Sequence, residues 1–304
     1  MYDLIVIGSP SFDRVVRDST FFQDQVLSGP SIISAVTARW LEIENLVVIG
    51  SLSSRDFSLL DHKLDTLAVP EFFKIGSPET GGFEVNYNGG IEPSFTRVLG
   101  VPKRIGIRDI PDEFLSTRYI LLTPLLQEVD AELTEWLCNS SDAIVLMDPQ
   151  IRTSEAGNRL GTIKELEIAS KTTCYLDFIK PNEEEAFFIT GVDDPFVAAE
   201  ILVDTLAENC IITRGTRGSI LFDGKELKII PSFKVNAIDT SGAGAAFLSG
   251  FISGLLNDER HDFCAALGAS VASFKVIGEN TDFSLDRSTA LARARELALE
   301  IKTH

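Results

Sequence analysis

The sequence predicts an α/β protein with a doubly wound, mostly parallel sheet that is flanked by helices and carries a small β lid. Short, continuous apolar runs recur along the chain, and many of them lead into a polar loop. Such runs are typical of parallel strands that are buried on both faces, and their alternation with helical stretches predicts βαβ units. The clearest runs are Leu4–Ile7, Leu46–Ile49, Tyr119–Leu122, Ala143–Met147, Cys174–Ile179 and Cys210–Thr213.

One region departs from this alternation of apolar runs and helical stretches. Between Gly81 and Val101, apolar and polar side chains alternate around Asn88-Gly89-Gly90, which predicts a half-exposed hairpin. The stretch from Arg14 to Gln25 has no helical phase, so the two regions could pair as a small sheet. A lid and a ribbon that only shields the main sheet are equally compatible with the pattern. We expect one domain over residues 1–304, with lid segments at about 13–28 and 81–104.

Charge and composition restrict the class of partner. The chain of 304 residues has 45 acidic and 27 basic residues and a net charge of -18, which argues against a nucleic-acid or anionic membrane partner. Backbone donors can still bind a small anion against this field. The four cysteines lie far apart and there are only three histidines, which argues against a zinc site or a Ser-His-Asp triad. The N-terminus lacks a signal-peptide pattern, so we expect a cytoplasmic protein.

The late stretch Asp239–Phe247 is the most distinctive one. Two glycines, Gly242 and Gly244, precede an apolar run at helical spacing. Free backbone N–H groups and the helix dipole make such a helix start an anion site, although a plain glycine-rich start fits the stretch alone equally well. The stretch lacks the Lys of a GxxxxGK[ST] loop, and Phe247 stands where GxGxxG needs its last glycine.

Polar loops follow several other predicted strands. Asp13, after the first strand, reads by itself as a cap or turn residue. Asp148-Pro149-Gln150-x-Arg152 could form a structural salt bridge or read sugar hydroxyls and phosphate. Asn182 and Glu185 share one helix face and could hold Mg²⁺ through hard oxygen ligands, but they also form a capping-box pattern, which we favour on the residues alone. Thr213-Arg214-Gly215-x-x-Gly218 reads alone as a plain turn.

Taken in order, these segments resemble the PfkB, or ribokinase-like, family of carbohydrate kinases, and the resemblance spans nearly the whole chain. The matching stretches are Gly8 with Asp13, Gly29-Pro30, Lys180–Glu185, Thr213–Gly218 and Asp239–Phe247. The resemblance implies a ribokinase-like fold and ATP-dependent phosphorylation of an alcohol of a small sugar, cyclitol or nucleoside. It also makes a homodimer through the lid a hypothesis.

The resemblance assigns a role to each matching residue. The N–H groups of Gly242, Ala243 and Gly244 would form the anion hole, and Asn182 and Glu185 would hold Mg²⁺ or its waters. Thr213, Gly215 and Gly218, together with Asn182, would border the nucleotide. The implied substrate contacts are Asp13, Gly29, Gln150, Arg152 and Asp239.

The chain departs from the family pattern where the catalytic base stands, because the Asp that follows Gly-Ala-Gly in the family is Ala245 here. A methyl group cannot accept the proton of the attacking hydroxyl, and general-base catalysis typically contributes about 10²–10⁴-fold. We therefore hold two hypotheses: an impaired kinase, whose Ala245 is engineered or natural, and a non-catalytic ligand-binding or regulatory protein of the same fold. A dehydrogenase is disfavoured because Gly8-Ser9-Pro10-Ser11 supplies no dinucleotide fingerprint.

Overall fold

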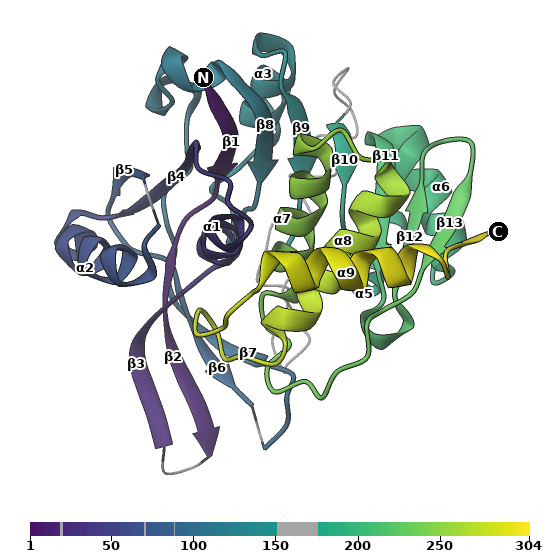
Figure 1. Ribbon diagram of the computed structural model, residues 1–304. Coiled ribbons are helices and arrows are strands. Elements are labelled where there is room, and N and C mark those ends of the chain that lie inside the picture. Colours follow the sequence, from purple (N-terminus) through teal and green to yellow (C-terminus); the bar gives the residue numbers. More distant parts are fainter. Residues whose placement is uncertain (19–20, 70, 88, 151–175) are drawn as a thin grey trace.

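The structure is a computed structural model that describes the chain except for residues 19–20, 70, 88 and 151–175 (Figure 1). A ten-stranded sheet runs through the molecule, and the strands from β5 to β11 along it pair in parallel. In their order across the sheet, the strands are β14 (Lys302–Thr303), β13 (Leu227–Ile230), β12 (Ser219–Phe222), β11 (Ala207–Thr213), β10 (Leu176–Ile179), β9 (Ile144–Met147), β8 (Thr117–Leu122), β1 (Tyr2–Ile7), β4 (Leu46–Ser53) and β5 (Phe72–Ser77). The predicted fold class is confirmed.

Helices cover both faces of this sheet, because successive side chains of a strand point to opposite faces and both sets are apolar. In β1, Leu4 and Val6 belong to one apolar cluster, whereas Ile5 and Ile7 belong to another. Figure 1 shows α1, α7, α8 and α9 together on the face toward the viewer. The helices of the first cluster are α1 (Pro30–Trp40), α2 (Phe57–Leu67), α7 (Ala243–Leu256), α8 (His261–Lys275) and α9 (Arg287–Ala298), and those of the second are α3 (Ala131–Ser140), α5 (Glu183–Thr190) and α6 (Pro195–Thr205).

Close packing of α7 against α8 fixes the direction in which α7 points. A Cβ atom on Gly250 would lie 2.9 Å from the Cα atom of Gly268, so the two backbones approach more closely than side chains allow. The helix α7 is almost entirely buried, from Ala245 to Leu255. Packing along almost the whole helix therefore fixes the position of its N-terminus.

The order of the strands identifies where a ligand can bind. The chain places β4 and β5 on one side of β1, and then β8 to β11 on the other, so the winding direction reverses at β1. In open α/β sheets, ligands bind beyond the carboxyl ends of the strands at such a reversal. The loops that follow β1, β9, β10 and β11 meet at this edge.

A second, four-stranded sheet lies near this edge. Its strands, in the order β3-β2-β6-β7, are β3 (Phe21–Ser28), β2 (Ser11–Asp18), β6 (Gly82–Asn86) and β7 (Ser94–Gly100), and we call it the small sheet. The pairing of β2 with β6 is parallel and joins the two regions that the sequence suggested could pair. Phe83, Val85 and Tyr87 pack against Leu125 and Leu126 of the main domain. A role for this sheet as a lid stays a prediction.

Candidate active site

The N-terminus of α7 is open toward the edge of the sheet. Gly242 precedes the helix with φ +71°, in the left-handed region that favours glycine. No side chain caps α7, whereas Asp130, Asn182 and Asp286 cap α3, α5 and α9 through their side chains. No side-chain cap occupies the first N–H groups of α7, but the Ala243 N–H donates to the Thr240 carbonyl oxygen at 3.3 Å. The anion-hole role of Gly242, Ala243 and Gly244 stays a prediction.

A buried ion pair lies directly against this helix start. Lys180 Nζ lies 3.1 Å from Asp148 Oδ1, and both side chains are almost fully buried. A Cβ atom on Gly244 would lie 2.9 Å from Lys180 Nζ and 3.7 Å from Asp148 Oδ2. The Gln150 side-chain amide donates to Asp148 Oδ2 at 2.7 Å. The ends of β9 and β10 thus bring a carboxylate, an amide and an ammonium group to the start of α7.

Sequence reasoning placed Asp148 and Gln150 near each other but considered Arg152, not Lys180, as the cationic neighbour. Arg152 lies outside the described residues. The motif Lys180–Glu185 assigns no role to Lys180, and the signal that could have found it is a lysine directly after a mainly apolar strand.

Asn182 and Glu185 form a reciprocal capping box at the start of α5. The backbone N–H of Asn182 donates to Glu185 Oε2, and the backbone N–H of Glu185 donates to Asn182 Oδ1, both at 2.8 Å. The amide N–H of Thr213 donates to the carbonyl oxygen of Pro181 at 3.0 Å, so the loops after β10 and β11 lie side by side. The capping interpretation is confirmed, and the metal role stays a prediction that the cap does not exclude.

The loop from Thr213 to Gly218 forms a closed turn. The Arg214 amide N–H donates to the Gly218 carbonyl at 2.8 Å, and Gly218 has φ +82°. Gly215 also lies in the left-handed region, with φ +56°. The turn conformation accounts for both glycines, and their contact with a nucleotide stays a prediction.

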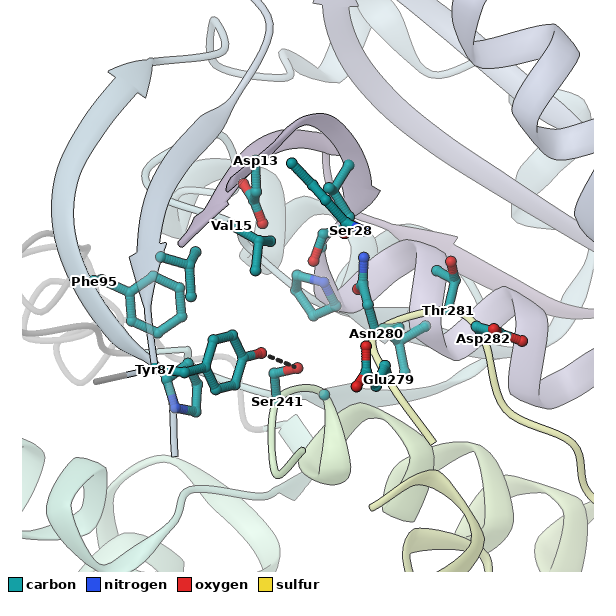
Figure 2. A pocket seen from close by; sticks show the side chains of 18 of the residues that line it. Asp13, Val15, Ser28, Tyr87, Phe95, Ser241, Glu279, Asn280, Thr281 and Asp282 are labelled. Atoms are coloured by element: carbon teal, nitrogen blue, oxygen red, sulfur yellow. Dashed lines mark hydrogen bonds between the residues drawn. The ribbon is translucent and has the colours of Figure 1, made fainter. Parts of the chain in front are cut away.

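A cavity of about 330 Å³ opens between the small sheet and the N-terminus of α7 (Figure 2). Of the predicted substrate contacts, Asp13, Gly29 and Gln150 line it, as does Gly242 of the predicted anion hole. Asp13 is 5% exposed, and its Oδ1 accepts the amide N–H of Phe83 at 2.9 Å. Figure 2 shows Tyr87 and Phe95 on one side of the cavity and Asn280 and Thr281 on the other.

Asp239 does not line this cavity and is fully buried. Its carboxylate pairs with Lys275 at 3.3 Å and accepts the hydroxyl of Tyr87 at 2.9 Å. Burial by itself raises the pKa of Asp239, but the Lys275 charge and hydrogen bonds from Asn280 and Ser241 outweigh it and hold that pKa below its usual range. Burial also lowers the pKa of Lys275. The predicted substrate contact of Asp239 stays a prediction, and the geometry favours a structural role.

Ala245, at the position where the sequence resemblance implies the catalytic base, is 1% exposed and belongs to the first apolar cluster. Its carbonyl accepts the Ser249 hydroxyl at 3.1 Å. The helix turn that would carry a base is therefore in place, and its side chain is a methyl group.

Several cavity residues were not predicted as site residues. Arg17 comes from β2, and a short segment after α8 contributes Glu279, Asn280, Thr281 and Asp282. No motif marks this segment, because its position depends on how α8 packs and not on a local pattern.

Comparison with known proteins identifies the family. The family model described as pfkB family carbohydrate kinase matches residues 114–287. The chain belongs to this family. A cytidine kinase of Thermococcus kodakarensis is 28% identical over 172 residues, which is 56% of this chain and 59% of that kinase. The chain thus matches little more than half the length of this curated relative.

Solved structures share the fold of this PfkB-family chain. A ribokinase from Thermotoga maritima has a TM-score of 0.75 at 21% identity and covers 97% of this chain and 100% of its own. A ribokinase of Arabidopsis thaliana, solved in complex with ribose and ATP, has a TM-score of 0.76 at 18% identity, with coverages of 97% and 99%. At these identities the likeness establishes the ribokinase-like fold alone.

Proposed function

We propose that this chain binds ATP with Mg²⁺ and transfers the γ-phosphoryl group to an alcohol of a small sugar, cyclitol or nucleoside, with a rate limited by Ala245. The observation that carries the proposal is the uncapped N-terminus of α7, which meets a buried lysine on one side and a cavity on the other. Phosphoryl transfer needs positioning and stabilisation of charge more than covalent chemistry. The cavity could position an acceptor, and the start of α7 with Lys180 could stabilise the charge on the phosphoryl group.

The donor phosphates would lie at the N–H groups of Gly242, Ala243 and Gly244. The Lys180 ammonium group lies against the same turn, and its charge adds to the helix dipole. The turn from Thr213 to Gly218 adjoins Asn182 through the Pro181 carbonyl, which supports a nucleotide along the ends of β10 and β11.

Asn182 and Glu185 fit a Mg²⁺ ion that keeps most of its waters. Their capping bonds fix an amide oxygen and a carboxylate at the head of α5, and these oxygens can accept further partners. In the described part of the chain, no three His, Cys, Asp or Glu side chains are placed so that they could hold a metal ion together. This suits an ion held by one or two protein oxygens, waters and phosphates. When bound, the ion would neutralise phosphate charge.

The acceptor would occupy the cavity beside α7. Asp13 would accept hydrogen bonds from its hydroxyl groups, and Gly29 and Gln150 would border it. The small sheet would act as the lid that excludes water, which strengthens electrostatic contacts and prevents hydrolysis of the donor. Arg152 would contribute to acceptor or phosphate recognition.

A second candidate function is a non-catalytic sensor of the same ligands, which Ala245 specifically favours. A phosphorylation screen of sugars, cyclitols and nucleosides with ATP separates the two. We expect Ala245→Asp to raise turnover of an accepted substrate by about 10²–10⁴-fold, and Ala245→Asn, which has a similar shape and no base, to give no such gain. Ligand binding without any gain from Ala245→Asp would favour the sensor and contradict the kinase.

The cellular setting is also a proposal. The described cysteines Cys138, Cys210 and Cys264 are free thiols, which supports a reducing compartment such as the cytoplasm. No described helix combines the length and apolarity needed to cross a bilayer. We further propose that homodimerisation uses the small sheet, where Phe22 and Leu99 are exposed. Sedimentation of the chain would test this.

A further inference from the structure

The fully buried Asp239 joins three separate parts of the molecule immediately before the anion-binding turn. One part is Tyr87, at the end of β6 in the small sheet, and the second is the turn itself, through Ser241. The third is the end of α8 and the segment after it, through Lys275 and Asn280. Asp239 therefore lies between the proposed lid and the proposed phosphate site.

Each of the two carboxylate oxygens of Asp239 accepts hydrogen bonds from different partners. Oδ1 accepts the Tyr87 hydroxyl and the Ser241 amide N–H, both at 2.9 Å. Oδ2 accepts the Ser241 hydroxyl and the backbone N–H of Asn280, both at 2.8 Å, and it pairs with Lys275. A shift of Tyr87 thus acts on the same oxygen that holds the backbone of the anion-binding turn.

The surroundings of Tyr87 favour its hydrogen bond to Asp239. It is 5% exposed, and burial raises the pKa of its phenol, so the hydroxyl remains a donor. The Arg17 guanidinium lies 4.5 Å from the centre of the Tyr87 ring and also pairs with Glu279 at 3.2 Å. Figure 2 shows the Tyr87 hydroxyl directed toward Ser241, at 3.5 Å from its hydroxyl.

A second contact connects the same two parts of the chain. The Thr240 amide N–H donates to the carbonyl oxygen of Ile91 at 3.1 Å, and Ile91 belongs to the connection between β6 and β7. The small sheet, with the connection between β6 and β7, is therefore bonded to two consecutive residues before the turn, Asp239 and Thr240. The Tyr87–Asp239 bond is buried, whereas the Thr240–Ile91 bond lies at the more exposed rim, because Ile91 is 43% exposed.

We propose that Tyr87 is a positioning residue that couples the small sheet to the phosphate-binding turn through Asp239. The meaning of this coupling for catalysis rests on the proposed function, whereas the coupling itself does not. Because linkage is reciprocal, a ligand that orders the turn stabilises the small sheet, and a ligand that closes the small sheet orders the turn.

Amide hydrogen exchange on the full chain tests this, with Tyr87→Phe as the variant. Phe keeps the ring and its contact with Arg17 and removes only the hydroxyl. Tyr2→Phe is the matched control, because the Tyr2 hydroxyl also donates to a carboxylate, Glu71 Oε2, at 3.1 Å and lies outside the site. Unchanged exchange in β10 and β11, which contain neither substituted residue, verifies that each variant is folded.

Without ligand, we expect Tyr87→Phe to speed exchange of the Ser241 amide about tenfold, since local opening costs less when a bond to a charged group is lost. Tyr2→Phe should leave it unchanged. Equal exchange at residues 239–246 in Tyr87→Phe and the unaltered chain would overturn the coupling, and this result needs no ligand.

The second arm adds MgATP and compares samples at equal occupancy. We expect protection of residues 82–100 in the unaltered chain and in Tyr2→Phe, and loss of that protection in Tyr87→Phe. Equal protection in all three would overturn the proposal. Absence of any MgATP binding would contradict the proposed function, and the ligand-free arm would then decide the coupling alone.

Discussion

The Lys180 ammonium group and the Asp148 carboxylate form an ion pair of 3.1 Å in which both side chains are almost fully buried. The pair joins the ends of two neighbouring strands and lies against Gly244, in the first turn of α7. A buried pair of this kind is weak evidence for stability, because desolvation offsets the attraction between its charges. Its position points instead to the anion that the turn would bind.

Lys180→Met tests how the ion pair between Lys180 and Asp148 contributes to stability and to phosphate binding. Loss of the ammonium group leaves Asp148 as an uncompensated buried charge, so we expect a decrease of about 3–5 kcal/mol in the free energy of unfolding. The double variant Lys180→Met/Asp148→Leu should recover much of this decrease in urea denaturation. MgATP affinity should remain weakened in both variants, and full recovery of affinity in the double variant would show that Lys180 has no part in phosphate binding.

Gly244→Ala tests the closeness of Lys180 to the turn. The new methyl group would lie 2.9 Å from Lys180 Nζ, so the lysine must shift, at a cost of about 1–3 kcal/mol in thermal or chemical denaturation. MgATP binding should weaken at the same time. Gly76→Ala is the control, because a Cβ atom there meets no atom within 4 Å. Equal effects of both substitutions would contradict the geometry.

Glu185→Gln separates the cap of α5 from the proposed metal role. Glutamine also completes a capping box, so the melting temperature should change little. Loss of the negative charge should weaken Mg²⁺-dependent binding of ATP, measured by titrating Mg²⁺ at fixed ATP, whereas Glu184→Gln should not. An unchanged Mg²⁺ dependence in Glu185→Gln would leave this glutamate with the capping role alone.

The stability of the chain at low pH should depend on Asp239. Its folded-state pKa is lowered from the ordinary value of 3.8: burial opposes the lowering, and the Lys275 charge with hydrogen bonds from Asn280 and Ser241 outweighs burial. A lowered folded-state pKa contributes stability that is fully present above the unfolded-state pKa and is lost as the pH falls through the folded-state pKa.

Urea unfolding between about pH 2 and pH 6 measures this contribution. The double variant Asp239→Asn/Lys275→Met removes both charges, and we expect its stability to fall less steeply with acid than that of the unaltered chain. Asp65→Asn, at an exposed position in α2, should leave the slope unchanged. An identical slope in the double variant would mean that Asp239 is not held ionised by its partners.

Local sequence patterns predicted the central strands and the cap of α5. They did not predict the site contacts that join residues far apart in the sequence. The apolar runs gave the central strands, and Asn182 with Glu185 gave the capping box, because both features depend on neighbours within a few residues. The contact of Tyr87 with Asp239 spans 152 positions, and no local pattern encodes it. Lys275 lies in an apolar helix, where its charge required a partner that the sequence alone does not identify.

Calorimetric titration of MgATP into the unaltered chain tests the central claim most directly, because the claim is that the start of α7 binds phosphate although Ala245 stands where the family resemblance implies the catalytic base. We predict binding at one site per chain that is markedly weakened in Gly244→Ala and retained in Gly76→Ala. Absence of binding to the unaltered chain, or equal affinity in Gly244→Ala, would contradict the account.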